Sequence, residues 1–135
     1  MATFVLTDAS VVINSVDLSD RVSSVTLSVE VDEQEDTAMG DTYRSRIGGL
    51  RDWSVDIEFH QDFGSSEVDD TIWPLVGTVA PIVIKPTSGA VSPTNPSYSG
   101  NVLVTEYSPI DGGVGDLATT SVSWPGAGPL TRATS

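Results

Sequence analysis

The sequence predicts a mainly β protein made of a single domain. Val, Ile and Thr together number 39, against 8 Leu and 2 Met, and β-branched side chains favour strands over helices. A chain of 135 residues has the size of one ordinary domain, and no shift in composition marks a linker. We therefore expect residues 1–135 to form one β-sandwich or β-barrel.

Two segments, 25–32 and 53–60, carry the clearest strand pattern. Apolar residues occupy every second position in both, which is typical of a strand with one buried face. The polar positions of the two strands include four acids: Glu30, Asp32, Asp56 and Glu58. Weaker alternation, bounded by Gly, Pro, Asn and Asp, predicts five more strands: 3–6, 10–14, 79–85, 100–108 and 116–124.

Proline indicates where regular structure is interrupted. Pro81 must lie at the start of a strand or at an edge, because it cannot donate a hydrogen bond to a ladder. The three prolines of residues 86–98 predict a surface loop. Residues from about 125 onward predict an extended C-terminal tail.

One segment, about 66–76, predicts a short flanking helix. Ser66 can cap its N-terminus and Gly77 can close its C-terminus. Pro74 removes a backbone hydrogen bond, so we expect the helix to be irregular there. An apolar stripe at helical spacing is formed by Val68, Ile72, Leu75 and Val76.

Residues 33–50 show no clean periodicity and predict a long loop between the two strongest strands. A loop of that length in a compact domain is usually functional or mobile. Its acids could bind calcium. However, Thr37 stands where the helix–loop–helix calcium template needs glycine, and Tyr43 stands where it needs the closing Glu. We expect a solvated or partner-facing acidic surface and no metal site.

The formal charge of −13, from 19 acids and 6 bases, excludes a surface that grips nucleic acid, because such a surface needs clustered Lys and Arg. The chain has no cysteine, and His60 is its only histidine. Thiolate metal sites, a cysteine nucleophile and any catalytic set with two histidines in one subunit are therefore excluded. Sixteen of the acids lie in residues 1–70, so one half of the chain carries the charge.

Two groups of residues could have a chemical function or an ordinary structural one. Asp56 and Glu58 share a strand face and could be the paired carboxylates of a glycosidase. However, acids that alternate with apolar residues occur on any half-exposed strand. Trp53, Trp73 and Trp124 lie on or near apolar faces and are expected in the core, with sugar stacking as the alternative. We expect no catalytic residue, no cofactor and no enzyme activity.

The order of these segments resembles the tail tube (major tail) proteins of long-tailed bacteriophages. The resemblance covers residues 25–124. It begins with the acidic strand, the long loop and GGLRDW (48–53) leading into the second strand. It continues with IWPL (72–75), NVLVTEYSPI (101–110), GDL (115–117) and SVSW (121–124).

The resemblance implies a structural virion protein that assembles into hexameric rings, which stack into a tube, with a long loop that bridges subunits or rings. Its partners would be further copies of the chain and other tail proteins, and DNA would pass through during ejection without specific binding. It would be assembled in the host cytoplasm and reside in the virion tail. The alternative is a binding module, such as a capsid decoration protein or a carbohydrate-binding β-sandwich.

On the tail interpretation, an acidic wall would repel DNA phosphates. We expect the lumen to be faced by Glu30, Asp32, Asp56 and Glu58. We expect contacts between subunits from Thr37, Met39, Tyr43, Arg44, Arg46 and Arg51. The three arginines could instead pair with acids of residues 33–41 in their own chain, and the sequence leaves both possibilities open.

The N-terminal residues lack the basic and apolar regions of a signal peptide. No apolar run approaches the roughly 20 residues that a membrane helix needs. We therefore expect no membrane anchor.

Overall fold

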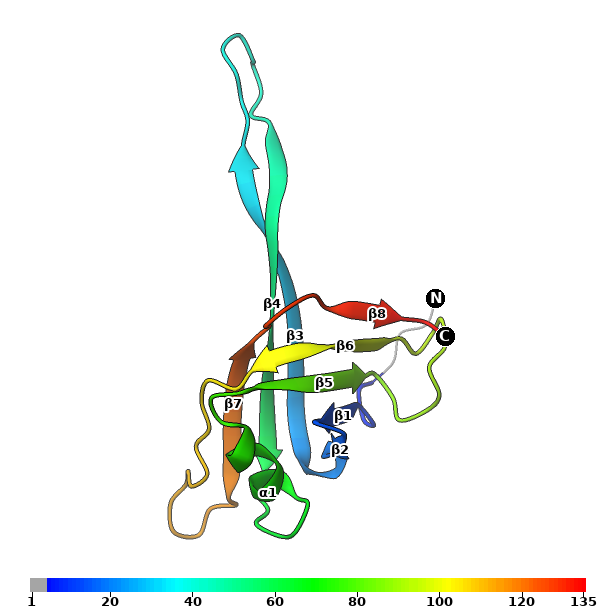
Figure 1. Cartoon of the computed structure of the whole chain (residues 1–135), viewed down its shortest axis with the longest axis vertical. Helices are drawn as coiled ribbons and strands as arrows, with labels where there is room; N and C mark the ends of the chain where they lie inside the picture. Colours follow the sequence, from blue (N-terminus) through cyan, green and yellow to red (C-terminus); the bar gives the residue numbers. More distant parts are fainter. Residues whose placement is uncertain (1–4) are drawn as a thin grey trace.

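The computed structural model describes residues 5–135 and consists of two antiparallel sheets packed on one another (Figure 1). The five-stranded sheet has the order β2-β1-β5-β6-β8, and the three-stranded sheet has the order β3-β4-β7. The first sheet comprises β1 (Ser10–Ile13), β2 (Val16–Asp17), β5 (Val79–Lys85), β6 (Ser97–Leu103) and β8 (Thr131–Ala133). The second comprises β3 (Val22–Glu35), β4 (Arg46–His60) and β7 (Thr119–Pro125). The predicted fold class is confirmed, as a sandwich and not a closed barrel.

The core lies between the two sheets and follows the alternation of the sequence. Trp53, Val55, Ile57 and Phe59 of β4 are all buried, as the pattern of residues 53–60 predicts. From the facing sheet, alternate residues of β1 and β5 fill the other side of the core. This burial orients β4, so its remaining side chains must point to solvent.

Most of the other predicted strands are confirmed, with shifts of a few residues at their ends. Residues 79–85 form β5 as predicted. Pro81 lies just beyond the pairing of β5 with β1, which begins at Ile82, and its carbonyl accepts a hydrogen bond from the Asn14 amide at 2.8 Å. The predicted strand 3–6 falls partly on residues 1–4, outside the described residues, and residues 5 and 6 lie in no strand.

Trp53 of β4 holds the segment that follows β7 and leads to β8. Its indole Nε1 donates a hydrogen bond to the Gly128 carbonyl at 2.7 Å, and its own carbonyl accepts one from the Gly126 amide at 2.7 Å. A Cβ added at Gly126 would lie 2.3 Å from the indole, closer than any real contact. Only glycine fits here, and the chain after β7 turns over the indole toward β8.

Gly126→Ala should therefore destabilise the fold by about 1–3 kcal/mol, the usual cost of overpacking a core. Gly128→Ala is the matched control, because a Cβ at Gly128 meets nothing within 4 Å. Urea unfolding followed by tryptophan fluorescence compares the two variants with the parent. Equal midpoints for both variants would contradict this packing at Trp53.

The predicted helix is present but shorter than expected. α1 (Val68–Ile72) is followed by the 3-10 turn η2 (Trp73–Leu75), which contains Pro74. The irregularity predicted near Pro74 is thus confirmed. The prediction that Ser66 caps the helix is wrong. Ser66 has a φ of 61°, its amide donates to the Asp70 carboxylate, and Glu67 occupies the cap position without a side-chain hydrogen bond.

Two of the three tryptophans lie in the core, and the third does not. Trp53 and Trp124 are buried, whereas the side chain of Trp73 is 63% exposed. The buried side of α1 is formed by Val68, Thr71 and Ile72. A residue directly after Ile72 points about 100° away around the helix axis, so Trp73 faces solvent.

Candidate functional site: an acidic sheet face and an exposed arm

The distal half of the β3–β4 hairpin projects from the body of the molecule (Figure 1). We call residues 29–52 the arm and residues 36–45, between the two strands, its tip. Every residue of the arm is exposed. A hairpin with no buried residue gains almost nothing from the hydrophobic core of its own chain.

The long loop predicted over residues 33–50 is therefore corrected to the ten residues 36–45. Glu35 pairs directly with Arg46, and the ladder continues to the body with one irregularity between Val31 and Glu33. Sequence alternation reveals a strand only where one face is buried. Neither face of the arm is buried, and beyond Asp32 its residues 33–35 and 46–52 carry no such pattern.

The arm exposes apolar side chains that a monomer would normally bury. Met39 and Tyr43 at the tip are 102% and 86% exposed, and Leu50 on β4 is 81% exposed. Thr37 serves the tip itself, since its hydroxyl accepts a hydrogen bond from the Ser45 amide at 2.8 Å. The tip thus has a defined shape and presents Met39 and Tyr43 outward.

The three arginines of this region divide into two groups. Arg44 lies 4.0 Å from a Glu35 carboxylate oxygen, and Arg46 forms an ion pair with Glu33. Among residues 5–135, Arg51 makes no ion pair within 4.0 Å. In the single chain, Arg44 and Arg46 thus pair with acids of their own hairpin.

The solvent face of the β3-β4-β7 sheet carries acids and hydroxyls, with His60 at one end and without Lys or Arg, and we call it the acidic face. Directly opposed residues of antiparallel strands point to the same side. The strand register and the alternation along β3 place on this side Ser24, Thr26, Ser28, Glu30, Asp32, Asp52, Ser54, Asp56, Glu58, Ser121 and Ser123. The Lys and Arg residues of these three strands are Arg46 and Arg51, which oppose Glu35 and Val31 on the other side. The four acids expected to face a lumen therefore share one strand face.

The acidic face ends in two strands whose outer edges carry no further strand. Within residues 5–135, both β3 and β7 pair only with β4. Open edges are sites where another chain can add a strand. One edge amide of β7, that of Ser123, donates to the exposed Glu106 carboxylate at 2.8 Å, a contact that a flexible side chain can release.

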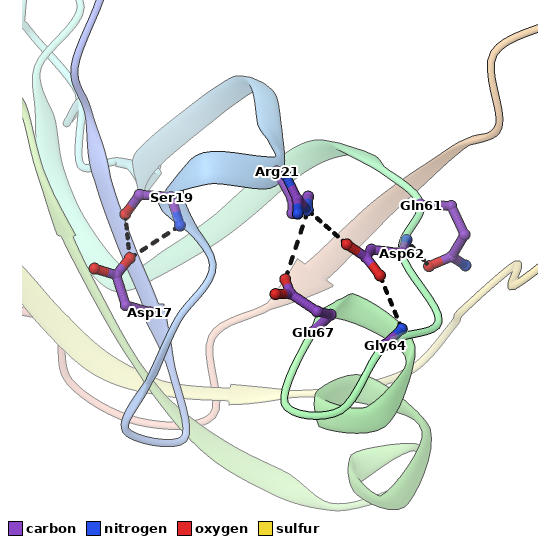
Figure 2. A network of polar contacts seen from close by, with 7 residues as sticks. All are labelled: Asp17, Ser19, Arg21, Gln61, Asp62, Gly64 and Glu67. Carbon is purple, nitrogen blue, oxygen red and sulfur yellow. Dashed lines mark hydrogen bonds and ion pairs between the residues drawn. The ribbon is translucent and has the colours of Figure 1, made fainter.

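The end of the molecule opposite the arm is held by a polar network (Figure 2). Arg21 of η1 (Ser19–Arg21) lies 2.9 Å from Asp62 and 3.5 Å from Glu67. The Gly64 amide and the Arg21 guanidinium lower the pKa of the Asp62 carboxyl, and hydrogen bonds from Ser19 lower that of Asp17. The network ties the start of β3 to the segment before α1.

Tyr107 fixes the segment after β6 to the same end. Its hydroxyl donates to Asp69 at 2.8 Å and accepts a hydrogen bond from Gln61 Nε2 at 2.9 Å. Burial, reinforced by the neighbouring Asp69 carboxylate, raises the pKa of Tyr107 to about 12. The neutral phenol is thus preferred in the folded chain.

The stability of the fold should accordingly fall as the pH rises from about 10, where an unfolded tyrosine ionises, to about 12. Below that window the contribution is fully present, because both states keep the proton. Tyr107→Phe should flatten this slope in denaturant titrations across the window, and Tyr43→Phe on the exposed tip should retain it. An unchanged slope in Tyr107→Phe would contradict the assignment.

In the described part of the chain, no helix has the length and apolar character to cross a membrane. Residues 5–135 hold no group of three or more His, Cys, Asp or Glu arranged to bind a metal ion. Asp56 and Glu58 lie among hydroxyl side chains in a shallow surface hollow. The features that set this molecule apart are therefore surfaces: the acidic face, the open edges and the arm.

Comparison with solved structures places the fold in a defined class. A chain from the virion of a native gene transfer agent (GTA) particle superposes with a TM-score of 0.75 at 15% identity, covering 93% of this chain and 95% of that one. A chain from the tail of an empty GTA particle with C6 symmetry has a TM-score of 0.66 at 14% identity, covering 82% and 81%. A chain from the 6-fold-symmetrised baseplate of the anti-feeding prophage (AFP) has a TM-score of 0.55 at 12% identity, covering 98% and 97%.

No known family matches the chain, and no curated protein matches it by sequence. The structural likeness nevertheless spans 82–98% of this chain. At these identities it establishes the fold. The fold expected from the resemblance to tail tube proteins is thus confirmed.

Proposed function

We propose that this chain is a structural subunit of a phage-like tail, which assembles into stacked rings that form a tube for DNA. The observation that carries the proposal is the acidic face without Lys or Arg, bounded by two open edges, on a fold shared with chains of the GTA virion and tail. The C6 symmetry of that tail favours rings of six copies. Other tail proteins would be further partners in the virion.

The two open edges suggest how a ring closes. If β7 of one copy pairs with β3 of the next, the sheets join into one continuous wall and no edge remains. Each copy then contributes the same acidic face to the same side of the wall. Edge amides that now meet water or Glu106 would enter a ladder.

The wall is proposed to face the lumen with Glu30, Asp32, Asp56 and Glu58. A duplex carries one negative charge per about 1.7 Å of its axis, so a wall rich in acids and without Lys or Arg repels it from every side. DNA would then slide through without binding. The hydroxyls between the acids keep the wall hydrated.

The arm is proposed to supply contacts between copies through Met39, Tyr43 and Arg51, which are exposed or unpaired in the monomer. Thr37, Arg44 and Arg46 would act by holding the shape of the tip. Association removes the exposed apolar side chains from water, which stabilises the assembly by about 25 cal/mol per Å² of apolar surface.

Negative-stain electron microscopy of the purified full chain tests this function. Rings or tubes of regular diameter are expected at salt concentrations that screen the repulsion between the negatively charged copies. Dispersed monomers across protein and salt concentrations would overturn the proposal. They would favour the binding-module alternative, for which the exposed Trp73 would be the contact to test next.

A further inference from the structure

A groove lies at the base of the arm, where β3 and β4 leave the body beside β6 and β8 (Figure 1). It consists of two hollows of about 400 and 360 Å³ that share Val29 and Tyr98 in their lining. Its floor is apolar, with Leu27 in one hollow and Leu130 in the other. We call it the cationic groove, for the reason given next.

Three of the six bases of the chain line this groove. Arg51 and Arg132 line one hollow and Lys85 the other, against a single acid, Asp52. Within residues 5–135, the other three bases form ion pairs, whereas these three form none within 4.0 Å. In a chain of charge −13, the three Lys and Arg residues without an ion pair are thus gathered along one groove.

The arm tip has the complementary chemistry. It exposes Met39 and Tyr43, and the acids Asp36 and Asp41 lie within it. Glu33 and Glu35 at the ends of its strands are balanced by Arg46 and Arg44, which leaves the tip acidic. In Figure 1 the tip lies at the far end of the arm from β6 and β8, so it cannot reach the groove of its own chain.

We propose that the cationic groove receives the acidic, apolar arm tip of a second copy of this chain. Met39 and Tyr43 would fill the apolar floor, and Asp36 and Asp41 would face the unpaired bases. Such a contact joins two different surfaces. A pair of copies therefore still has one free tip and one free groove, and the contact can repeat through the assembly. This inference rests on the proposed function, since it names the acceptor of the arm in the tube.

Disulfide cross-linking tests it, because the chain contains no cysteine of its own. The double variant Thr42→Cys/Gly128→Cys keeps the anchors Met39 and Tyr43 and places one thiol on the exposed tip and one at the groove, where an added Cβ meets nothing within 4 Å. The matched control is Thr42→Cys/Val114→Cys. Val114 is fully exposed in the segment 104–118, at the end opposite the arm (Figure 1).

After assembly and mild oxidation, non-reducing gels should show a ladder of covalent multimers for the first double variant. Each single variant should stop at dimers, and the control pair should form no ladder. Higher ionic strength during assembly should reduce the ladder, because it screens the opposite charges.

Three results would overturn the inference. Tubes of the first double variant without a ladder would overturn it and leave the proposed function standing. A ladder for the control pair alone would place the tip at the opposite end of the neighbour. Absence of rings and tubes from the unmodified chain would overturn the proposed function, and this inference with it.

Discussion

Replacing the tip by a two-residue turn should abolish tube assembly and leave the fold intact. Glu35 and Arg46 are paired in register, so an Asn-Gly turn in place of residues 36–45 can close the hairpin directly. No residue of the arm is buried, so the free energy of unfolding should change little. Loss of the anchors Met39 and Tyr43 should cost each interface about 2–4 kcal/mol, the range of interface hot spots.

Thermal unfolding and electron microscopy of the same preparation check the two halves of this prediction. Met39→Ser/Tyr43→Ser serves as a graded variant that keeps the tip and its charges, and it should reduce tube yield without shortening the arm. Tubes of parental yield from the shortened chain would mean that the arm does not hold the assembly together.

Reversing the charge of the acidic face should turn a tube that DNA passes through into one that retains DNA. Lysine at positions 30, 32, 56 and 58 raises the formal charge by eight, from −13 to −5. It also places bases where the parent has none. Each neutralised phosphate should add about −0.9 to the slope of log K against log salt, so retention should be strong at low salt and lost at high salt.

The control keeps the same four positions but makes them neutral, with Gln for Glu and Asn for Asp. That variant should assemble without retaining DNA, as the parent does. Asp56→Lys/Glu58→Lys is a smaller change, at positions that face only Thr26, Ser24 and the hydroxyls of β7. Co-sedimentation of labelled duplex with tubes measures retention. Equal retention by parent and reversed tubes would contradict a lumenal acidic face.

The sequence predicted the fold wherever burial gives a strand two different faces. β4 alternates over residues 53–60 because Trp53, Val55, Ile57 and Phe59 enter the core. Its continuation from Arg46 to Asp52 was missed, since both faces of the arm meet water in the single chain. β8 was missed because it has three residues, too few for a periodicity.

The sequence allowed the acids to be assigned to one strand face, but it did not allow the cationic groove to be predicted. The acids of β3 and β4 could be assigned to one polar face from alternation alone. Arg51, Lys85 and Arg132 lie on three different strands, and only the packing of one sheet on the other brings them together. No local pattern in the sequence encodes that juxtaposition.

A cryo-electron microscopy reconstruction of assembled tubes shows directly whether the acidic face lies on the inner or the outer side of the tube wall. We predict rings of six copies in which Glu30, Asp32, Asp56 and Glu58 line the inner wall, with β3 and β7 of neighbouring copies side by side. A reconstruction with these four acids on the outer wall would contradict it.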